Sequence, residues 1–427
     1  MNKTSGANSF EPHELRQSAL TEIHARPFAL IQTPGRILHF AFTSDAAGAA
    51  HAAEAVAGLC VEHKLATPNA AAKQICVDLP AGRLAFERHG EFVTYTWTFP
   101  TGRTVFSPAP DSLQGAMRLL PQPGPLLVAA DLHLLAAADA PDDIDALFDG
   151  PTVAASSIDD GRATVASDFM ADASGFVRIL VVDHTLSPSS AGALVQRLLE
   201  IETYRMLALT GLPMAQRLGP SIRRIESELP ALLSSMQRER GLAADRVLLD
   251  RLTALATELE TDAAQGLFRL GATRAYHELV LARLDAIKES RIPHHSTLAS
   301  FLARRLTPAI RTCATVEQSQ TTLSSKIARI AELLRTRVDI ELESQNADQI
   351  RQMAERVRLQ LRLQQTVEGL SIAAITYYVS SVLHLLFEGA HGSGVHVDPA
   401  VATGAAVPVV FAVVAFIVWR IRHAHTE

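Results

Sequence analysis

The sequence predicts an α+β domain, then an all-helical region with antiparallel helices and a long stalk helix, and finally two transmembrane helices. Short apolar runs separated by turn residues fill residues 1–186, and sequence rich in Leu, Ala, Arg, Glu and Gln follows them. Two charge-free apolar segments lie near the end. With 427 residues, 48% of them hydrophobic, the chain is long enough for more than one domain.

The composition excludes several classes of protein. A formal net charge of −6 over the whole length argues against nucleic acid as a partner. Cys60, Cys76 and Cys313 are too scattered for a zinc site and too few for a disulfide framework, and reduced, buried cysteines suit a cytoplasmic body. The polar N-terminus lacks the apolar core of a secretory signal. We therefore expect the bulk of the chain to stay in the cytoplasm.

Residues 1–186 carry the pattern of the α+β domain. Residues 91–99 alternate as a half-buried antiparallel strand does, with Thr94 and Thr96 on one side and Tyr95 and Trp97 on the other. The alanine-rich residues 45–64 predict a helix, and residues 142–148 predict a shorter one. Gly and Pro residues bound the predicted strands, which cover residues 37–42, 74–79, 82–89, 91–99, 126–134, 152–157, 162–169 and 176–183.

Helical spacing begins after the turn residues 187–192. Residues 187–314 predict a helical hairpin region with a bend or first turn near Pro308, divided at Pro213, Gly219–Pro220, Gly241, Gly266 and Pro293. Residues 315–369 predict the stalk helix. Its amphipathic stripe has spacings of three and four residues and consists of Leu323, Ile327, Ile330, Leu334, Val338, Ile350, Met353, Val357 and Leu361.

Residues 370–388 and 401–420 predict the two transmembrane helices. They contain stretches of 18 and 19 residues without a formal charge, and about 20 apolar residues cross a hydrocarbon core of about 30 Å. Arginines precede the first segment and follow the second, whereas the outer loop 389–400 has no Lys or Arg, so both ends, including the tail 421–427, are expected in the cytoplasm. The alternative is a buried helical hairpin in a soluble domain.

Distinctive stretches are spread over almost the whole chain. They read EIHARPF (22–28), ERHGEFVTYTW (87–97), QRLLEIETYRMLALTGLP (196–213), RAYHELV (274–280), LLRTRVDIELESQN (333–346) and LQLRLQQTVEGLSIAAITYY (359–378). The chain resembles a bacterial family of membrane-anchored proteins, domain-of-unknown-function family 3422. The resemblance implies a bacterial inner-membrane location, with the lipid bilayer as partner. It implies no reaction, because that family has none assigned.

The order of the predicted elements is also similar to the CorA-like magnesium channels. That resemblance implies a homo-oligomeric cation channel with a cytoplasmic regulatory domain, a first span that lines the pore, and a divalent cation as the candidate ligand. In those channels a Gly-Met-Asn signature marks the outer end of the first span, whereas this chain reads FEGAHGSG at residues 387–394. The departure keeps a second hypothesis open, a membrane-anchored regulatory or scaffold protein without transport activity.

One face of the first span carries the candidate pore-lining residues. These are Tyr377, Ser380, Ser381 and His384, with Glu388 at the mouth. Rings of hydroxyls and carbonyl dipoles replace an ion's hydration shell, and an acidic ring concentrates cations. The alternative is that these polar groups hydrogen-bond between helices and hold a bundle together. The outer loop also offers candidate metal ligands, namely Glu388, His391, His396 and Asp398.

No catalytic motif is present, so we expect neither an enzyme nor a bound cofactor. Phosphate loops, G-x-G-x-x-G, H-E-x-x-H and G-x-S-x-G are all missing. A hidden acid-base site would show a deep, water-accessible pocket around His24 or His89. The alternative is ion pairs that tie a terminal segment down. Polar residues expected to make such pairs or contacts between helices are His24, Arg26, Glu87, Arg88, Glu91, Glu200, Glu202, Arg205, Arg274, Tyr276 and His277.

Overall fold

The computed structural model describes residues 13–16, 19–20, 28–69, 72–100, 105–106, 111–392 and 398–424. Within these residues the N-terminal part forms one mixed sheet with the strand order β2-β3-β4-β1-β5-β8-β7-β6-β9. Only the β5–β8 pair among them is parallel. The strands are β1 (Gly35–Thr43), β2 (Gln74–Leu79), β3 (Gly82–Arg88), β4 (Phe92–Phe99), β5 (Leu126–Ala136), β6 (Ala154–Ile158), β7 (Ala163–Ser167), β8 (Val177–Asp183) and β9 (Glu289–Arg291).

Mostly helical sequence follows the sheet strands. The described α-helices are α2 (Ala46–Glu62), α3 (Asp111–Arg118), α4 (Pro188–Leu209), α5 (Gly211–Arg238), α6 (Leu242–Ala286), α7 (Leu298–Gly392) and α8 (Pro399–Ala424). Side-chain oxygens accept from backbone N–H groups at the start of several of them. Asp45 accepts from Gly48 at α2, and Ser187 accepts from Ser190 at α4, where Pro188 also fits the first turn.

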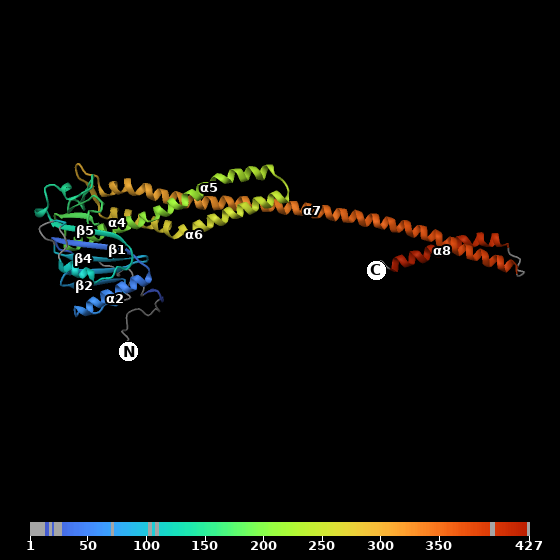
Figure 1. The fold of residues 1–427 in the computed structure, drawn as a ribbon, viewed down its shortest axis with the longest axis horizontal. Coiled ribbons are helices and arrows are strands. Elements are labelled where there is room, and N and C mark those ends of the chain that lie inside the picture. Colours follow the sequence, from blue (N-terminus) through green and yellow to red (C-terminus); the bar gives the residue numbers. More distant parts are fainter. Residues whose placement is uncertain are drawn as a thin grey trace. The chain divides into compact units, whose positions relative to one another are not determined.

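Helices lie on both faces of the sheet (Figure 1), and apolar side chains pack between each helical layer and the strands. Helix α2 packs on one face through Ala52, Ala53 and Val56, against strand residues that include the fully buried Trp97. Helix α4 packs on the opposite face, together with the end of α6 and the start of α7. Strand β4 is therefore buried on both sides and not half-buried as its alternation predicts, because each face has its own helical layer.

The chain divides into two compact units. The first contains residues 1–233 and 252–329 and holds the sheet. The second contains residues 234–251 and 330–427. In the second unit the Arg337 guanidinium donates to the carbonyl oxygens of Met236 and Glu239 and lies 3.2 Å from the buried carboxylate of Asp245. This arginine thereby ties the end of α5 and the start of α6 to α7.

Several predicted helix breaks do not interrupt a helix. Gly219–Pro220 lies inside α5 and Gly266 inside α6. A Cβ atom at residue 266 would lie 2.8 Å from Leu218 Cδ1, so this glycine marks a close approach of α6 to α5. Helix α7 starts at Leu298 and not at residue 315, and it passes Pro308. Gly241 does separate α5 from α6, where its positive φ suits glycine.

Some short elements also differ from the prediction. Residues 142–148 contain a single 3₁₀ turn, Asp145–Leu147, instead of an α-helix. Helix α3 and strand β9 were not predicted. Strand β9 has the sequence ESR, which has no apolar alternation, and it joins the sheet by pairing with β6 from more than a hundred residues earlier in the chain. Such a pairing leaves no local signal in the sequence.

Helices α7 and α8 are, among the described residues, the helices long and apolar enough to cross a membrane. The predicted stripe on α7 changes its surroundings along the helix. Its first members Leu323, Ile327 and Leu334 are buried, whereas Ile350, Met353 and Val357 are exposed. Apolar side chains at the C-terminal end of α7 and along α8 are largely exposed as well.

Candidate functional site

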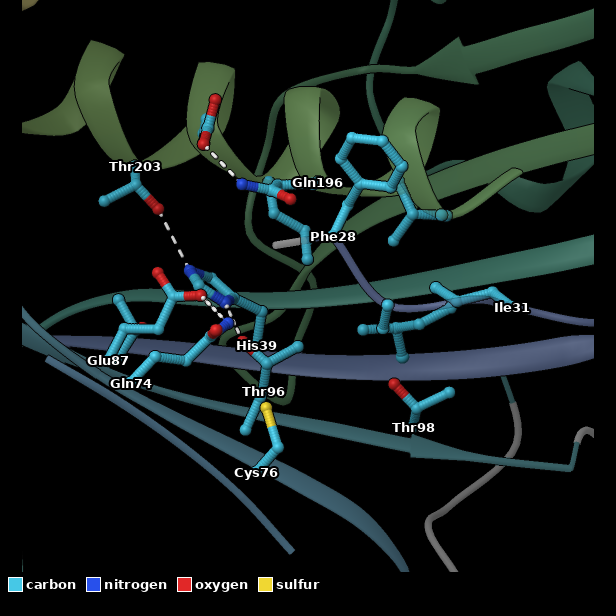
Figure 2. Close-up of a pocket in the computed structure, with 18 of the residues that line it drawn as sticks. Phe28, Ile31, His39, Gln74, Cys76, Glu87, Thr96, Thr98, Gln196 and Thr203 are labelled. Carbon is cyan, nitrogen blue, oxygen red and sulfur yellow. Dashed lines mark hydrogen bonds between the residues drawn. The ribbon is translucent and has the colours of Figure 1, made fainter. Parts of the chain in front are cut away.

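A pocket of about 150 Å³ lies between helix α4 and the sheet face formed by β1, β2, β3 and β4 (Figure 2). All the residues that line it belong to the first unit. Ile37, Val195 and Leu199 form an apolar wall. Polar side chains from β2, β3, β4 and α4 form the remainder, among them Gln74, Glu87, Thr96, Gln196 and Glu200.

The register of the strands brings the polar side chains into rows. His39 on β1 pairs with Thr96 on β4, Thr96 with Ala85 on β3, and Ala85 with Cys76 on β2. In the neighbouring row, Thr94 pairs with Glu87, and Glu87 with Gln74. Side chains two residues apart on a strand share one face, so both rows face α4. Residues distant in sequence thereby line one pocket.

Helix α4 contributes the opposite wall through residues three, four and seven positions apart. Gly192, Val195, Leu199 and Thr203 follow this spacing and face the sheet. A Cβ atom at residue 192 would lie 1.7 Å from the carbonyl oxygen of Ala29, so only glycine lets residues 28–31 cross the helix there. The Ile31 N–H donates to the Pro188 carbonyl oxygen at the start of the same helix. Residues 28–31 thereby close one end of the pocket.

His39 is a buried, neutral link between the two walls. Its Nδ1 lies 2.8 Å from Thr96 Oγ1, and its Nε2 lies 3.0 Å from Thr203 Oγ1. Burial lowers its pKa from 6.5 to about 4, against a smaller opposing effect of Glu87. A neutral imidazole has one donor and one acceptor nitrogen, and both are engaged here. His39 therefore positions β1, β4 and α4 and does not supply a proton.

Two carboxylates in the pocket are held by neighbouring amides. Gln74 Nε2 donates to Glu87 Oε1 over 2.9 Å, and Gln196 Nε2 donates to Glu200 Oε1 over 3.0 Å. The other oxygen of Glu200 accepts from Arg283 on α6. This pattern turns the amide nitrogens toward the carboxylates and leaves the amide carbonyl oxygens as acceptors.

The lining of the pocket is suited to binding a small ligand. Cys76 is exposed, so the expectation of buried cysteines is wrong for this one. Desolvation by its neighbours still raises the pKa of the thiol, so the weakly nucleophilic protonated form dominates at neutral pH. The hydroxyl groups nearest an imidazole in the lining are those of Thr96 and Thr203, and both are bonded to His39. In the part of the chain that the structure describes, no group of three or more His, Cys, Asp or Glu side chains could hold a metal ion. Shape, acceptors and apolar contact are what it offers to a ligand.

The comparison with protein families is decisive for classification. A family model described as "Protein of unknown function (DUF3422)" matches residues 11–425. The chain belongs to this family. No curated protein and no solved structure shows significant similarity to it. The matched region of this DUF3422 protein includes both the pocket and the two apolar helices.

The structure places the predicted polar residues of the DUF3422 protein in different settings. His24 and Arg26 lie outside the described residues. His89 lines the pocket, with its ring stacked on Phe92 at 4.0 Å between centroids and its Nε2 3.5 Å from Glu87 Oε2. Glu91 instead pairs with Arg269 on α6. The structure thus places His89 in a pocket, beside Glu87.

The predicted contacts of α4 and α6 fall into two kinds. Glu200 pairs with Arg283 of α6, and Arg274 of α6 pairs with Glu317 of α7 at 3.1 Å, so both contacts join helices. Arg205 instead pairs with Glu202 inside α4, through two contacts of 2.6 Å. The same guanidinium also donates to the Phe169 carbonyl oxygen and lies over the Phe169 ring.

The candidate pore residues lie on the last turns of α7 beside α8. His384 Nδ1 lies 2.9 Å from Thr403 Oγ1 of α8. Thr403 donates its own hydrogen to the Pro399 carbonyl oxygen, so His384 Nδ1 is the donor of the bond between the helices. Ser381 donates to the Tyr377 carbonyl oxygen within α7. The ring of Tyr377 is exposed, and Ser380 Oγ is buried.

The residues predicted as metal ligands near the outer loop have different settings in the structure. Glu388 is exposed near the end of α7, and His391 lies in its last turn. Asp398 accepts the Ala400 N–H and so caps the start of α8. His396 lies outside the described residues. The described members of this set thus do not form a metal site.

Sequence reasoning missed the residues that shape the pocket. His39, Gln74 and Gln196 were not singled out. His39 did leave a signal, because it is the polar residue at an inward position of the apolar strand ILHFAF. Gln74 and Gln196 left none, because their meaning depends on the strand register and on the position of α4.

Proposed function

We propose that this DUF3422 protein is a membrane-anchored regulatory protein. The C-terminal part of α7 and helix α8 tether it to the bacterial inner membrane, and the sheet-bearing unit recognises a ligand or partner in the cytoplasm. The observation that carries the choice of tether over pore is the hydrogen bond between His384 and Thr403. This bond gives the His384 imidazole, the most polar group of the first apolar segment, a hydrogen-bond partner on the neighbouring helix.

The exposed apolar surface supports insertion into a bilayer. Leu385 and Leu386 on α7 and Val409 on α8 each expose more than half of their surface. Water disfavours such surface by roughly 25 cal/mol per Å², whereas lipid tails accept it. Helices satisfy their own backbone hydrogen bonds, so both segments are suited to a hydrocarbon core.

The flanking charges support the orientation. Arg351, Arg356, Arg358 and Arg362 precede the first apolar segment, and Arg420 follows in the second helix. The connecting residues 389–400 contain the acidic Asp398 but no Lys or Arg. The positive-inside rule then places the sheet-bearing unit and the C-terminus in the cytoplasm, with the connection outside.

A CorA-like cation channel is the competing function. The order of elements favours it, and a pore would need the polar face of α7 to line a central path in an oligomer. Two observations weigh against it. The outer end of the first span lacks the Gly-Met-Asn signature, and the hydroxyl of Ser381 and the imidazole of His384 already have partners within the helix pair.

Ion flux into liposomes separates the two functions. For a tether, liposomes that contain the wild-type protein should take up Mg²⁺ or Co²⁺ no faster than protein-free liposomes. His384→Leu should leave the rate of uptake unchanged. It should lower the thermal stability of the solubilised protein, because the hydrogen bond between His384 and Thr403 is lost. His51→Leu, on an exposed face of α2, serves as the matched control for stability.

A saturable flux through the wild-type protein, abolished by His384→Leu and retained by His51→Leu, would overturn the tether in favour of the channel.

A single cysteine placed at Ser393 tests the orientation, since a membrane-impermeant reagent should label it from outside in intact spheroplasts. Labelling only after lysis would contradict the proposed topology.

A further inference from the structure

We propose that the pocket between α4 and strands β1, β2, β3 and β4 binds a small organic amine: an ammonium head on an apolar body about the size of a benzene ring. This inference goes beyond the anchoring function, because the pocket lies wholly within the first unit and its chemistry is independent of the membrane.

The volume sets the size of the ligand. The pocket encloses about 150 Å³, and an apolar cavity of about 150 Å³ in another protein holds one benzene molecule. A ligand with one six-membered ring and a short polar substituent fits this space.

The polar groups set the chemistry of the head. The amide nitrogens of Gln74 and Gln196 both donate to carboxylates, which directs their carbonyl oxygens elsewhere as acceptors. Glu87 and Glu200 add carboxylate oxygens, each with more than one lone-pair direction. An ammonium group has three N–H donors and no acceptor, so it matches a wall rich in acceptors.

The donors in the lining are less suited to an anion. His39 has both ring nitrogens engaged by threonine hydroxyls. Arg83 is exposed at the rim and lies 3.8 Å from Asp78. Arg283 is already paired with Glu200. A carboxylate or phosphate would therefore face Glu87 and Glu200 and would meet a guanidinium in the lining only at the exposed Arg83.

The apolar wall sets the body of the ligand. Ile37, Val195 and Leu199 are buried and form the apolar part of the lining. Figure 2 shows Phe28 on the side of the pocket away from Glu87 and Gln74. Half of the Phe28 surface is exposed, and an apolar ring in the pocket would cover part of it. The polar and apolar sides thus orient the ligand.

Three probes of equal size test the proposal on the full-length protein in detergent. We expect benzylamine to bind at least about 10-fold more tightly than benzyl alcohol, as charge-assisted hydrogen bonds predict. Benzoate should bind more weakly than both. Isothermal titration or ligand-observed NMR gives the three affinities. Equal or tighter binding of benzoate, or binding of none of the three at millimolar concentration, would overturn the proposal.

Matched variants locate the binding. Glu87→Gln keeps the shape of the side chain and should weaken benzylamine about 10-fold while leaving benzyl alcohol within about twofold. Asp78→Asn changes an exposed carboxylate on the neighbouring strand β2 and should leave all affinities unchanged. Ala85→Leu fills the pocket from β3 and should abolish binding in a protein whose melting temperature shows that it is folded. Unchanged benzylamine affinity in both Glu87→Gln and Ala85→Leu would refute this site.

Discussion

Replacing Glu202 with glutamine is expected to lower the free energy of unfolding of the first unit by about 3–5 kcal/mol, the usual cost of removing one partner of a buried ion pair. Glu202 and Arg205 are both buried, and two contacts of 2.6 Å join the carboxylate to the guanidinium. Without the carboxylate, the Arg205 charge stays under the Phe169 carbonyl with no anion to neutralise it. Urea denaturation followed by Trp97 fluorescence measures the change.

A double variant and a surface pair serve as controls for this result. Glu202→Leu combined with Arg205→Leu removes both charges and should recover much of the loss, because no uncompensated charge remains. Asp159→Asn breaks the exposed pair with Arg162 and should cost at most about 1 kcal/mol. A loss below 1 kcal/mol for Glu202→Gln would contradict the assignment of this pair as a buried structural one.

Acidification from pH 7 to pH 4 is expected to destabilise the first unit steeply. Burial lowers the pKa of His39 from 6.5 to about 4 and that of His133 to about 3. Above pH 6.5 both histidines are neutral in the folded and unfolded states, so they add no pH dependence. Below it, the unfolded chain binds protons that the folded unit excludes, and the His39 shift alone corresponds to about 3 kcal/mol.

One neighbouring group opposes this trend. Burial raises the pKa of Asp131, which contacts both His133 and Arg36, and a folded carboxyl with a raised pKa gains stability as the pH falls. Because the folded pKa of Asp131 lies above its ordinary value, this carboxyl takes up its proton within the same window and offsets part of the histidine effect. Two histidines act against one carboxyl, so the free energy of unfolding should still fall as the pH drops from 6.5 to 4, with a slope below two protons.

The slope of the free energy of unfolding against pH identifies the histidines that cause the loss of stability in acid. Thermal or urea unfolding is followed from pH 7.5 to 4 in a Trp419→Phe background, so that Trp97 in the sheet core reports alone. His39→Gln can still hydrogen-bond and should reduce the slope by about one proton. His63→Gln, at the exposed end of α2, should leave it unchanged. Equal slopes in the wild type and His39→Gln would show that His39 is not a buried neutral group.

Local patterns in the sequence were sufficient for most of the strands. Predicted strands such as 74–79 and 126–134 agree with β2 and β5 to within two residues, because period-two alternation and Gly or Pro punctuation are local signals. The glycine and proline rules failed inside α5 and α6. There, packing against neighbouring helices outweighs the local cost, as the contact between Gly266 and Leu218 shows.

The sheet order and the pocket could not be read from the sequence in the same way. The parallel pairing of β5 with β8 and the addition of β9 depend on contacts between distant segments. His89 was a candidate because of its neighbours in the chain. The partnership of His39 with Thr203 spans 164 residues and exists only after α4 packs on the sheet. Functional groups brought together by packing are therefore invisible to local patterns.

Sedimentation of lysed cells tests the central claim, that the two C-terminal helices anchor the protein in a membrane. The account predicts that the full-length protein pellets with the membranes, stays there after an alkaline carbonate wash, and is released by detergent. Full-length protein that remains unaggregated in the high-speed supernatant without detergent would contradict it.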